Sequence, residues 1–259
     1  METEVNFEEY ITRMEEITDK VTLLDYIDPV STVLDYGCGS GHLAESFTPE
    51  KYTGFDIAPS MVKRAETDHP LYTFTSELPT DQKFDVVIFS SLLHEVYSYN
   101  GRLLQEVVEV LQFAKTLLTP GGSILIRDGI RPLHSTSVHK LLLKDSWDAQ
   151  KFLNHLQTHS PFSFPVEING HYIEGSLAAL VHFFNVYTWG WKSVKREQKE
   201  RVNFVDLNEW LFLLECAGLR ALEVNVISQE DYFEHLETLV DLNGLRWETK
   251  AFFLAVPEL

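Results

Sequence analysis

The sequence predicts an α/β protein built on a doubly wound, mainly parallel sheet. Strand-like and helix-like segments alternate along residues 31–129, as in sheets that carry helices on both faces. The segment 84–89 is almost continuously apolar, which is typical of a central parallel strand covered on both sides. The first strand-like segment, 32–36, runs directly into a glycine-rich turn.

Local patterns predict the individual elements of this sheet. Residues 4–27 carry apolar side chains at roughly helical spacing, which predicts a helix or helix pair that packs on the sheet or forms a lid. Pro59 suits the first turn of a helix, and the Pro-Gly-Gly at 120–122 ends another. In chain order we expect strands at 32–36, 52–57, 71–74, 84–89 and 123–127, with helices at 41–47, 59–66 and 102–118.

The pattern changes after Asp128. Residues 130–200 are polar, helix-like and interrupted by prolines, which predicts a helical insertion. A helix at 207–217, a strand at 221–228, a helix at 230–243 and a strand at 247–256 then complete a seven-stranded sheet. The expected division is an N-terminal helical segment (1–30), a core (31–129), the insertion (130–200) and the rest of the core (201–259).

The charge of the chain bears on its partners. With 21 basic and 39 acidic residues the formal net charge is −18. Binding to a nucleic-acid backbone requires clustered Lys and Arg, so this balance disfavours a nucleic-acid partner without excluding a local basic patch. A small-molecule or peptide-like substrate is favoured instead.

The remaining composition indicates a cytoplasmic protein. Two cysteines, Cys38 and Cys216, indicate a reducing compartment and make no zinc site by themselves. The acidic start, Met-Glu-Thr-Glu-Val, does not fit a secretory signal. The most apolar segment, 177–187, is short and contains His182 and Asn185, so no membrane span is expected. The oligomeric state stays open.

The glycine-rich turn is the first motif with chemical meaning. Gly37, Gly39 and Gly41 alternate directly after a strand, so that backbone without Cβ atoms can pass close to a ligand near a helix N-terminus. A dinucleotide fingerprint requires glycine where His42 stands, and no Gly-Lys-Ser/Thr of a P-loop occurs. The spacing suits a ligand whose amino acid and ribose lie against the turn.

Asp56 is the second motif. It ends the second expected strand, 17 positions beyond Gly39, where nucleoside-binding folds place a carboxylate that binds the ribose hydroxyls. Because a helix begins near Pro59, a capping role is the alternative.

Together these motifs resemble class I S-adenosylmethionine-dependent methyltransferases. Four segments match in order: Val33 to Gly41, Gly54 to Ile57, Phe84 to Ser91, and Leu118 to Gly122. They lie within residues 31–128, about two-fifths of the chain. The resemblance implies a Rossmann-like sheet with an antiparallel last strand, and S-adenosyl-L-methionine as cofactor. It also implies these cofactor-binding residues: Asp35, Gly37, Gly39, Gly41, Asp56, Ile57, Ser76, Glu77, Ser90 and Ser91.

Three candidate catalytic residues follow the fourth and fifth strands. Methyl transfer needs in-line positioning and exclusion of water, and a general base only for some acceptors. His94 is a candidate base and Glu95 its orienting partner or an amine ligand, while Asp128 is a candidate substrate ligand. The alternatives are a packing role for His94 and a surface ion pair for Asp128.

An aromatic and basic segment at 187–197 is the candidate acceptor surface. Aromatic rings stack on bases or sugars, and Arg or Lys binds carboxylates or phosphates. The alternative is a buried aromatic anchor followed by a solvated helix. No metal site is expected, because His155 and His159 lack an obvious third ligand. The candidate substrate-binding residues are Tyr97, Arg131, Tyr187, Trp189 and Arg196.

The leading functional hypothesis is O- or N-methylation of a small-molecule or peptide-like acceptor. One alternative keeps the cofactor but transfers an aminocarboxypropyl or carboxymethyl group, as in biosynthesis of nucleotide-peptide antibiotics; the cations Arg127, Arg131 and Arg196 would suit a carboxymethyl group. The others are a tRNA or nucleic-acid methyltransferase and a non-catalytic scaffold. Product mass distinguishes the transferred groups.

Overall fold

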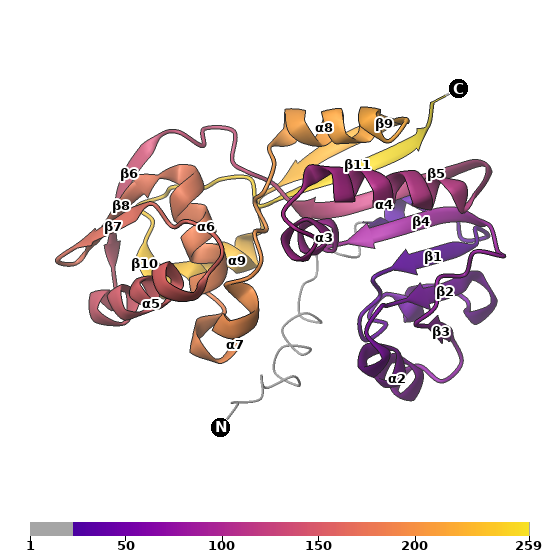
Figure 1. The fold of residues 1–259 in the computed structure, drawn as a ribbon, viewed down its shortest axis with the longest axis horizontal. Helices are drawn as coiled ribbons and strands as arrows, with labels where there is room; N and C mark the ends of the chain where they lie inside the picture. Colours follow the sequence, from indigo (N-terminus) through magenta and orange to yellow (C-terminus); the bar gives the residue numbers. More distant parts are fainter. Residues whose placement is uncertain (1–22, 259) are drawn as a thin grey trace.

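The structure is a computed structural model that describes residues 23–258 (Figure 1). The helix expected at 4–27 lies outside these residues except for its last positions, where residues 23–26 form a 3-10 turn. None of the described helices is long and apolar enough to cross a membrane.

A seven-stranded sheet forms the larger part of the molecule. Its strand order is β3-β2-β1-β4-β5-β11-β9, and β11 runs antiparallel to both of its neighbours. The predicted fold class is therefore confirmed, including the antiparallel last strand. The strands are β1 (Val33–Tyr36), β2 (Tyr52–Phe55), β3 (Thr73–Thr75), β4 (Phe84–Ser90), β5 (Leu118–Gly129), β9 (Leu219–Ile227) and β11 (Lys250–Pro257).

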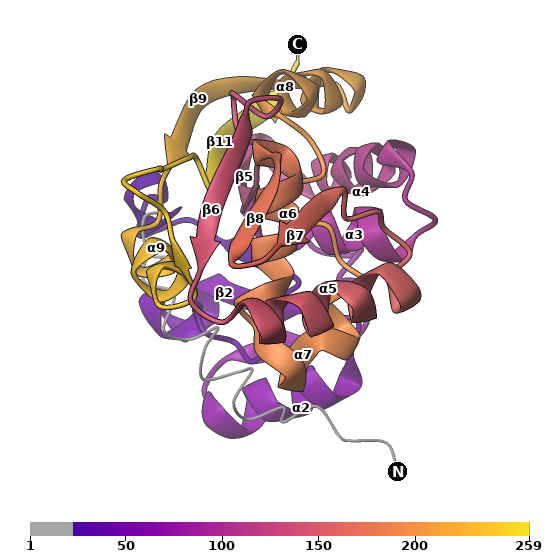
Figure 2. The same cartoon turned by 90° about the vertical axis from the view of Figure 1, so that its left-hand side faces the viewer.

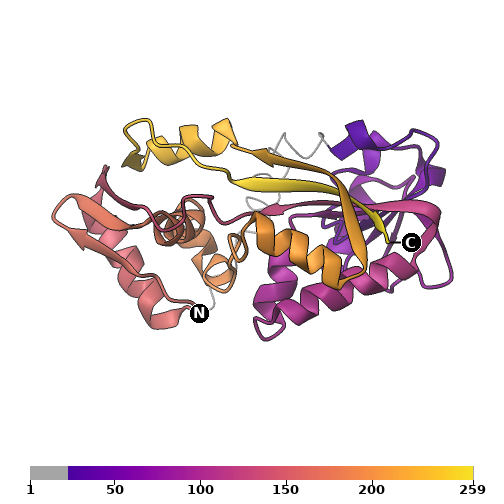
Figure 3. The ribbon, with the colours of Figure 1, turned by 90° about the horizontal axis from the view of Figure 1, so that it is seen from above.

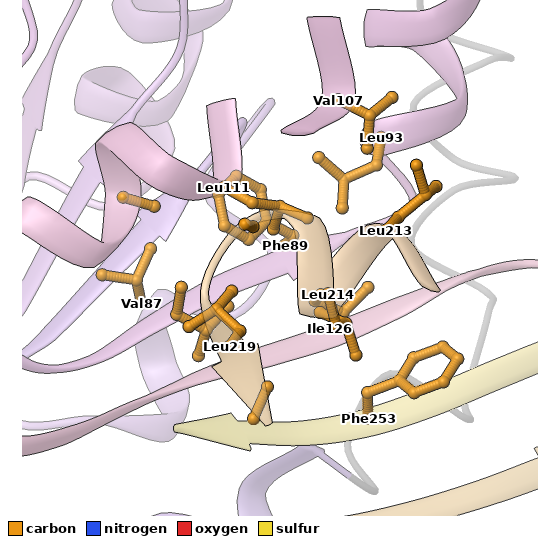
Figure 4. Close-up of a cluster of buried hydrophobic side chains, with 14 of the residues drawn as sticks. Val87, Phe89, Leu93, Val107, Leu111, Ile126, Leu213, Leu214, Leu219 and Phe253 are labelled. Atoms are coloured by element: carbon orange, nitrogen blue, oxygen red, sulfur yellow. The ribbon is translucent and has the colours of Figure 1, made fainter. Parts of the chain in front are cut away.

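Helices cover both faces of this sheet because successive side chains of a buried strand point to opposite sides. Val87 and Phe89 of β4 pack under α3 (Leu93–Tyr99), α4 (Leu104–Thr116) and α8 (Leu207–Cys216) (Figure 4). The alternate residues Val86 and Ile88 pack on the other side with α2 (Pro59–Asp68). The parallel strands β1 and β4 end toward the insertion (Figure 1).

The prediction of a helix at 41–47 was wrong. Only the 3-10 helices η2 (Ala44–Ser46) and η3 (Pro49–Lys51) follow the glycine turn. Gly41 has φ +83° and Pro49 starts η3, so the segment between them is too short for continuous α-helical hydrogen bonding.

The insertion is mixed α/β, which corrects the expectation of a helical segment. Its helices are α5 (Ser146–His159), α6 (Leu177–Tyr187) and α7 (Gly190–Glu197). Three antiparallel strands accompany them: β6 (Val138–Leu143), β7 (Val166–Asn169) and β8 (Tyr172–Ser176). The tight turn between β7 and β8 requires the positive φ of Gly170. Figure 2 shows the insertion in front of the sheet.

A second segment completes the insertion. The connection between β9 and β11 carries α9 (Glu230–Glu237) and β10 (Val240–Asp241), and it extends from the sheet to the insertion (Figure 3). Val240 of β10 pairs with Leu143 of β6. Phe233 and Trp247 join the hydrophobic core of the insertion. The helix expected at 230–243 therefore ends early and gives way to an edge strand.

Candidate functional site

The glycine turn is tied to the end of β2. The backbone N–H groups of Gly37 and Cys38 donate to the carbonyl of Phe55, at 2.7 and 2.9 Å. The Asp56 carboxylate accepts one hydrogen bond from Gly39 N and one from Ala58 N, both at 2.9 Å. Because a carboxylate offers about four acceptor positions, both oxygens of Asp56 keep capacity for the hydroxyl groups of a ribose.

The surroundings of Gly39 fit a nucleoside ligand. A Cβ atom there would meet only Met61 Cε, at 3.7 Å, so open space lies above the turn. Ile57 is 85% exposed beside it and offers an apolar surface to a flat base. At the other two glycines there is no room for a side chain, since a Cβ at Gly37 would meet Leu92 at 2.7 Å and one at Gly41 would meet Phe74 at 2.8 Å.

The remaining predicted cofactor residues divide into two groups. Asp35 is buried and accepts a hydrogen bond from Tyr52 Oη at 2.8 Å, so this carboxylate has a partner within the protein. Ser76 and Glu77 are exposed just after β3. Ser90 Oγ is buried and has no hydrogen-bond partner among the described residues. An orphaned hydroxyl at this end of β4 fits a polar ligand beside the glycine turn.

Ser91 has a strained backbone at the end of β4. Its φ is +57°, which is uncommon for a residue with a side chain. Two contacts with the fully buried Arg127 hold it: Ser91 N donates to the Arg127 carbonyl at 2.7 Å, and Arg127 Nη1 donates to Ser91 Oγ at 2.6 Å. Such strain persists where the surroundings over-determine it, often at functional sites.

A cavity of about 410 Å³ opens between this edge of the sheet and the insertion. Its lining comes from the start of α3, from α6 and α7, and from α9 and the first residue of β11. We call it the acceptor cavity, because residues of the predicted acceptor segment 187–197 line it. Its lining residues are Ser91, His94, Glu95, Asn185, Thr188, Trp189, Arg196, Glu197, Glu200, Val202, Gln229, Asp231, Tyr232, His235, Thr249 and Lys250.

Two of the five predicted substrate-binding residues, Trp189 and Arg196, line the acceptor cavity. The other three, Tyr97, Arg131 and Tyr187, do not belong to its lining. Tyr97 stacks on Phe204 with ring centroids 4.9 Å apart. Arg131 forms ion pairs with Asp206 and Glu209. Tyr187 is buried in the insertion core and donates to Asp148 at 3.1 Å.

The predicted catalytic residues His94 and Asp128 form a buried pair. His94 Nδ1 lies 2.7 Å from Asp128 Oδ1, and His94 N donates to Asp128 Oδ2 at 3.1 Å. The other ring nitrogen faces Glu200, with Nε2 and Oε2 3.8 Å apart. Asp128 is fully buried, so it braces His94 from behind and does not reach the cavity. The structure thus places Asp128 behind His94 and outside the lining of the cavity.

We predict that His94 is a stable imidazolium. Burial lowers the pKa of His94, but the Asp128 and Glu200 carboxylates outweigh burial and raise this pKa to about 10. Because the folded pKa exceeds the unfolded value of about 6.5, the stabilisation is fully present below pH 6.5 and is lost as pH rises through 10. NMR titration of the ring should show no deprotonation below pH 9; a midpoint between pH 6 and 7 would contradict this assignment.

Glu95 and Glu200 share one guanidinium. Arg196 Nη2 donates to Glu95 Oε1 at 2.8 Å, and Arg196 Nε donates to Glu200 Oε1 at 3.1 Å. Glu200 also accepts a hydrogen bond from Tyr99 Oη at 2.8 Å. Glu95, a predicted catalytic residue on α3, thus contacts Arg196, a predicted substrate-binding residue on α7, although the two are 101 residues apart in the chain.

Glu197 lies in the same wall without such partners. Its side chain lines the cavity and the residue is only 5% exposed. Among the described residues its carboxylate makes no hydrogen bond or ion pair, although the charges of Arg196, His94 and Lys250 act to lower its pKa. Burial and the nearby Glu200 carboxylate raise the pKa of Glu197 to about 8, and they raise that of Glu95 to about 8 as well. The pKa of both carboxyl groups therefore lies above its ordinary value.

His94, Glu95 and Glu200 bring potential metal-ligand atoms within 4.8 Å of one another. Charged groups of the protein itself already pair with these three side chains. Arg196 bridges the two glutamates, and Asp128 pairs with the histidine. The cluster is therefore best described as an ion-pair network in the cavity wall.

Similarity to known proteins identifies the family of this chain. The family model described as a methyltransferase domain matches residues 7–224. No curated protein matches the sequence. The fold is similar to an S-adenosylmethionine-dependent methyltransferase from Methanosarcina mazei (TM-score 0.53, 15% identity, covering 92% of this chain and 97% of that one). It is also similar to magnesium protoporphyrin IX methyltransferase from Synechocystis (0.51, 13%, 95% and 83%) and to the CcbJ methyltransferase from Streptomyces caelestis (0.51, 11%, 93% and 89%).

Proposed function

Because this chain belongs to the methyltransferase domain family and is an S-adenosylmethionine-dependent transferase, we propose that it methylates a small-molecule or peptide-like acceptor held in the acceptor cavity. The attacked atom is a nitrogen or an oxygen of that acceptor. Two neighbours in fold are consistent with a small acceptor: one is a magnesium protoporphyrin IX methyltransferase, and the other is an O-methyltransferase from neocarzinostatin biosynthesis in complex with 1,4-dihydroxy-2-naphthoic acid.

Two neighbouring residues at the end of β4, Ser91 and Leu92, support this proposal. Leu92 packs against Gly37 of the glycine turn, and Ser91 lines the acceptor cavity. The cofactor side and the acceptor side are therefore one residue apart at the end of β4. This is where open α/β sheets bind their ligands, and it is the arrangement that in-line transfer between two bound molecules requires.

Separate groups of residues would carry the separate tasks. Asp56 and Ile57 would hold the nucleoside of the cofactor, which supplies an activated methyl group on a sulfonium. Trp189 and Tyr232 would position the acceptor. His94 is poorly suited to act as a base because it is held as an imidazolium. Glu95 and Glu197, with pKa values raised to about 8, are better placed to accept a proton from the acceptor.

The cavity gives no support to a nucleic-acid substrate. Four carboxylate side chains line it: Glu95, Glu197, Glu200 and Asp231. Phosphate groups would be repelled by these carboxylates. A transferred carboxylate, as in carboxymethyl transfer, would meet the same carboxylates, but also Arg196 and Lys250 in the same lining.

Calorimetry with S-adenosylmethionine and S-adenosylhomocysteine, followed by mass spectrometry of candidate acceptors, tests the proposal. We expect micromolar binding of both ligands and products heavier than the acceptor by one CH₂ group. A product carrying a larger added group would replace methyl transfer with another group transfer. Folded protein that binds neither ligand would refute the proposed function.

A further inference from the structure

The acceptor cavity has more negative than positive side chains. Four carboxylate residues line it, against the cations Arg196, Lys250 and His94. Arg196 is engaged by Glu95 and Glu200. His94 is paired with Asp128 behind the wall. Arg196, His94 and Lys250 each act to lower the pKa of Glu197, but burial and Glu200 outweigh them, so the wall can still accommodate a further cation.

Glu197 is the cavity carboxylate that a further cation would pair with. It is buried at the end of α7 and faces the cavity, and no described residue gives its carboxylate a hydrogen bond. Burying a carboxylate without a hydrogen-bonding partner is costly. A ligand that donates N–H groups and carries positive charge would remove that cost.

We propose that the acceptor is a cationic amine, whose ammonium group is bound by Glu197 and Glu95 and whose apolar body lies against Trp189 and Tyr232. This inference rests on the proposed function and names the substrate class for the same site. The methylated atom is then the amine nitrogen.

The electrostatics of the wall agree with this assignment. Burial and Glu200 raise the pKa of Glu197 to about 8, because a further negative charge is unfavourable there. A bound ammonium reverses the balance, since an opposite charge within about 4–6 Å favours the ionised carboxylate. Aromatic faces add to this preference, because a cation within about 6 Å of a ring centroid is attracted by the ring.

The chemical step balances with these groups. The ammonium loses one proton to the Glu197 carboxylate, and the freed nitrogen lone pair attacks the methyl carbon. The bond between that carbon and sulfur breaks, and its electron pair stays on sulfur, which yields S-adenosylhomocysteine. The product is a protonated methylamine, and the proton on Glu197 passes to solvent. No oxidant, reductant or metal is needed.

Matched pairs of probes test the substrate class. Tyramine and tyrosol, and likewise tryptamine and tryptophol, differ only in an ammonium against a hydroxyl group. Binding to the full chain is measured by calorimetry, with S-adenosylhomocysteine present and absent. We expect each amine to bind about tenfold or more tightly than its alcohol, the scale of one hydrogen bond to a charged group.

Two variants locate the preference. Glu197→Gln keeps the size of the side chain and removes its charge, and we expect it to abolish the amine preference while S-adenosylhomocysteine affinity stays unchanged. Glu234→Gln on α9 is the matched control, since Glu234 is exposed, and it should retain the preference in full. Both variants are first checked for an unchanged melting temperature.

The outcomes separate the inference from the proposed function. Alcohols that bind as tightly as the amines, no binding by either amine, or a preference that survives in Glu197→Gln would each overturn the inference. Binding of S-adenosylhomocysteine alongside any of these results leaves the methyltransferase proposal standing. Amine binding that depends on Glu197 without any cofactor binding would support the cation site and overturn the proposed function.

Discussion

Asp128→Ala is expected to lower the free energy of unfolding at pH 7 by about 3–5 kcal/mol, the scale for breaking a buried ion pair. Asp128 is fully buried, and its carboxylate accepts hydrogen bonds from the backbone N and from the ring Nδ1 of His94. It also accepts one from Gly129 N at 2.6 Å. Alanine would leave the Nδ1 of a buried imidazolium and two backbone donors with no acceptor.

Urea denaturation followed by circular dichroism measures this loss. Asp81→Ala provides the control, because Asp81 is exposed in the loop before β4, and a surface change of this kind stays within about 0.5 kcal/mol. At pH above 10 the imidazolium is deprotonated, so the deficit of Asp128→Ala should shrink there. Equal stability of the two variants at pH 7 would show that the pair contributes nothing.

Asp56→Ala is expected to weaken S-adenosylhomocysteine binding on the order of 100-fold, from the loss of two hydrogen bonds between ribose hydroxyls and a charged acceptor. The substitution acts in a second way as well. Asp56 also fixes Gly39 N and Ala58 N, so the glycine turn loses its connection to the start of α2. Calorimetry on the folded variant measures the affinity.

Asp56→Asn separates the two effects. Asparagine keeps one acceptor oxygen for the backbone but carries no charge, so its affinity should fall between those of the wild type and Asp56→Ala. If a folded Asp56→Ala protein keeps the wild-type affinity, the nucleoside does not bind at the end of β2.

The sheet could be predicted because its signals are local. The segment 84–89 is apolar throughout and Gly218 ends α8, so each element is recognisable from its own residues. The hairpin of β7 and β8 was missed although Val166 and Ile168 alternate with Glu167 and Asn169, because the neighbouring prolines favoured a loop or broken helix.

The acceptor cavity could be predicted only in part. His94, Glu95, Trp189 and Arg196 stood out through their neighbours in sequence, and the fold brings all four to one wall. Glu197 and Glu200 gave no such signal, because a glutamate on a polar helix is ordinary until packing buries it. Their significance depends on α7 meeting α3, a contact between segments about a hundred residues apart.

The pairing of β10 with β6 has a consequence for changing the acceptor by design. A graft limited to residues 130–206 would bring β6 without its neighbour Val240 and expose the edge of the smaller sheet, and an unpaired edge invites aggregation. It would also omit Asp231 and Tyr232, which supply part of the cavity wall from α9. A transplantable specificity module must therefore be discontinuous, joining the insertion to residues 228–249.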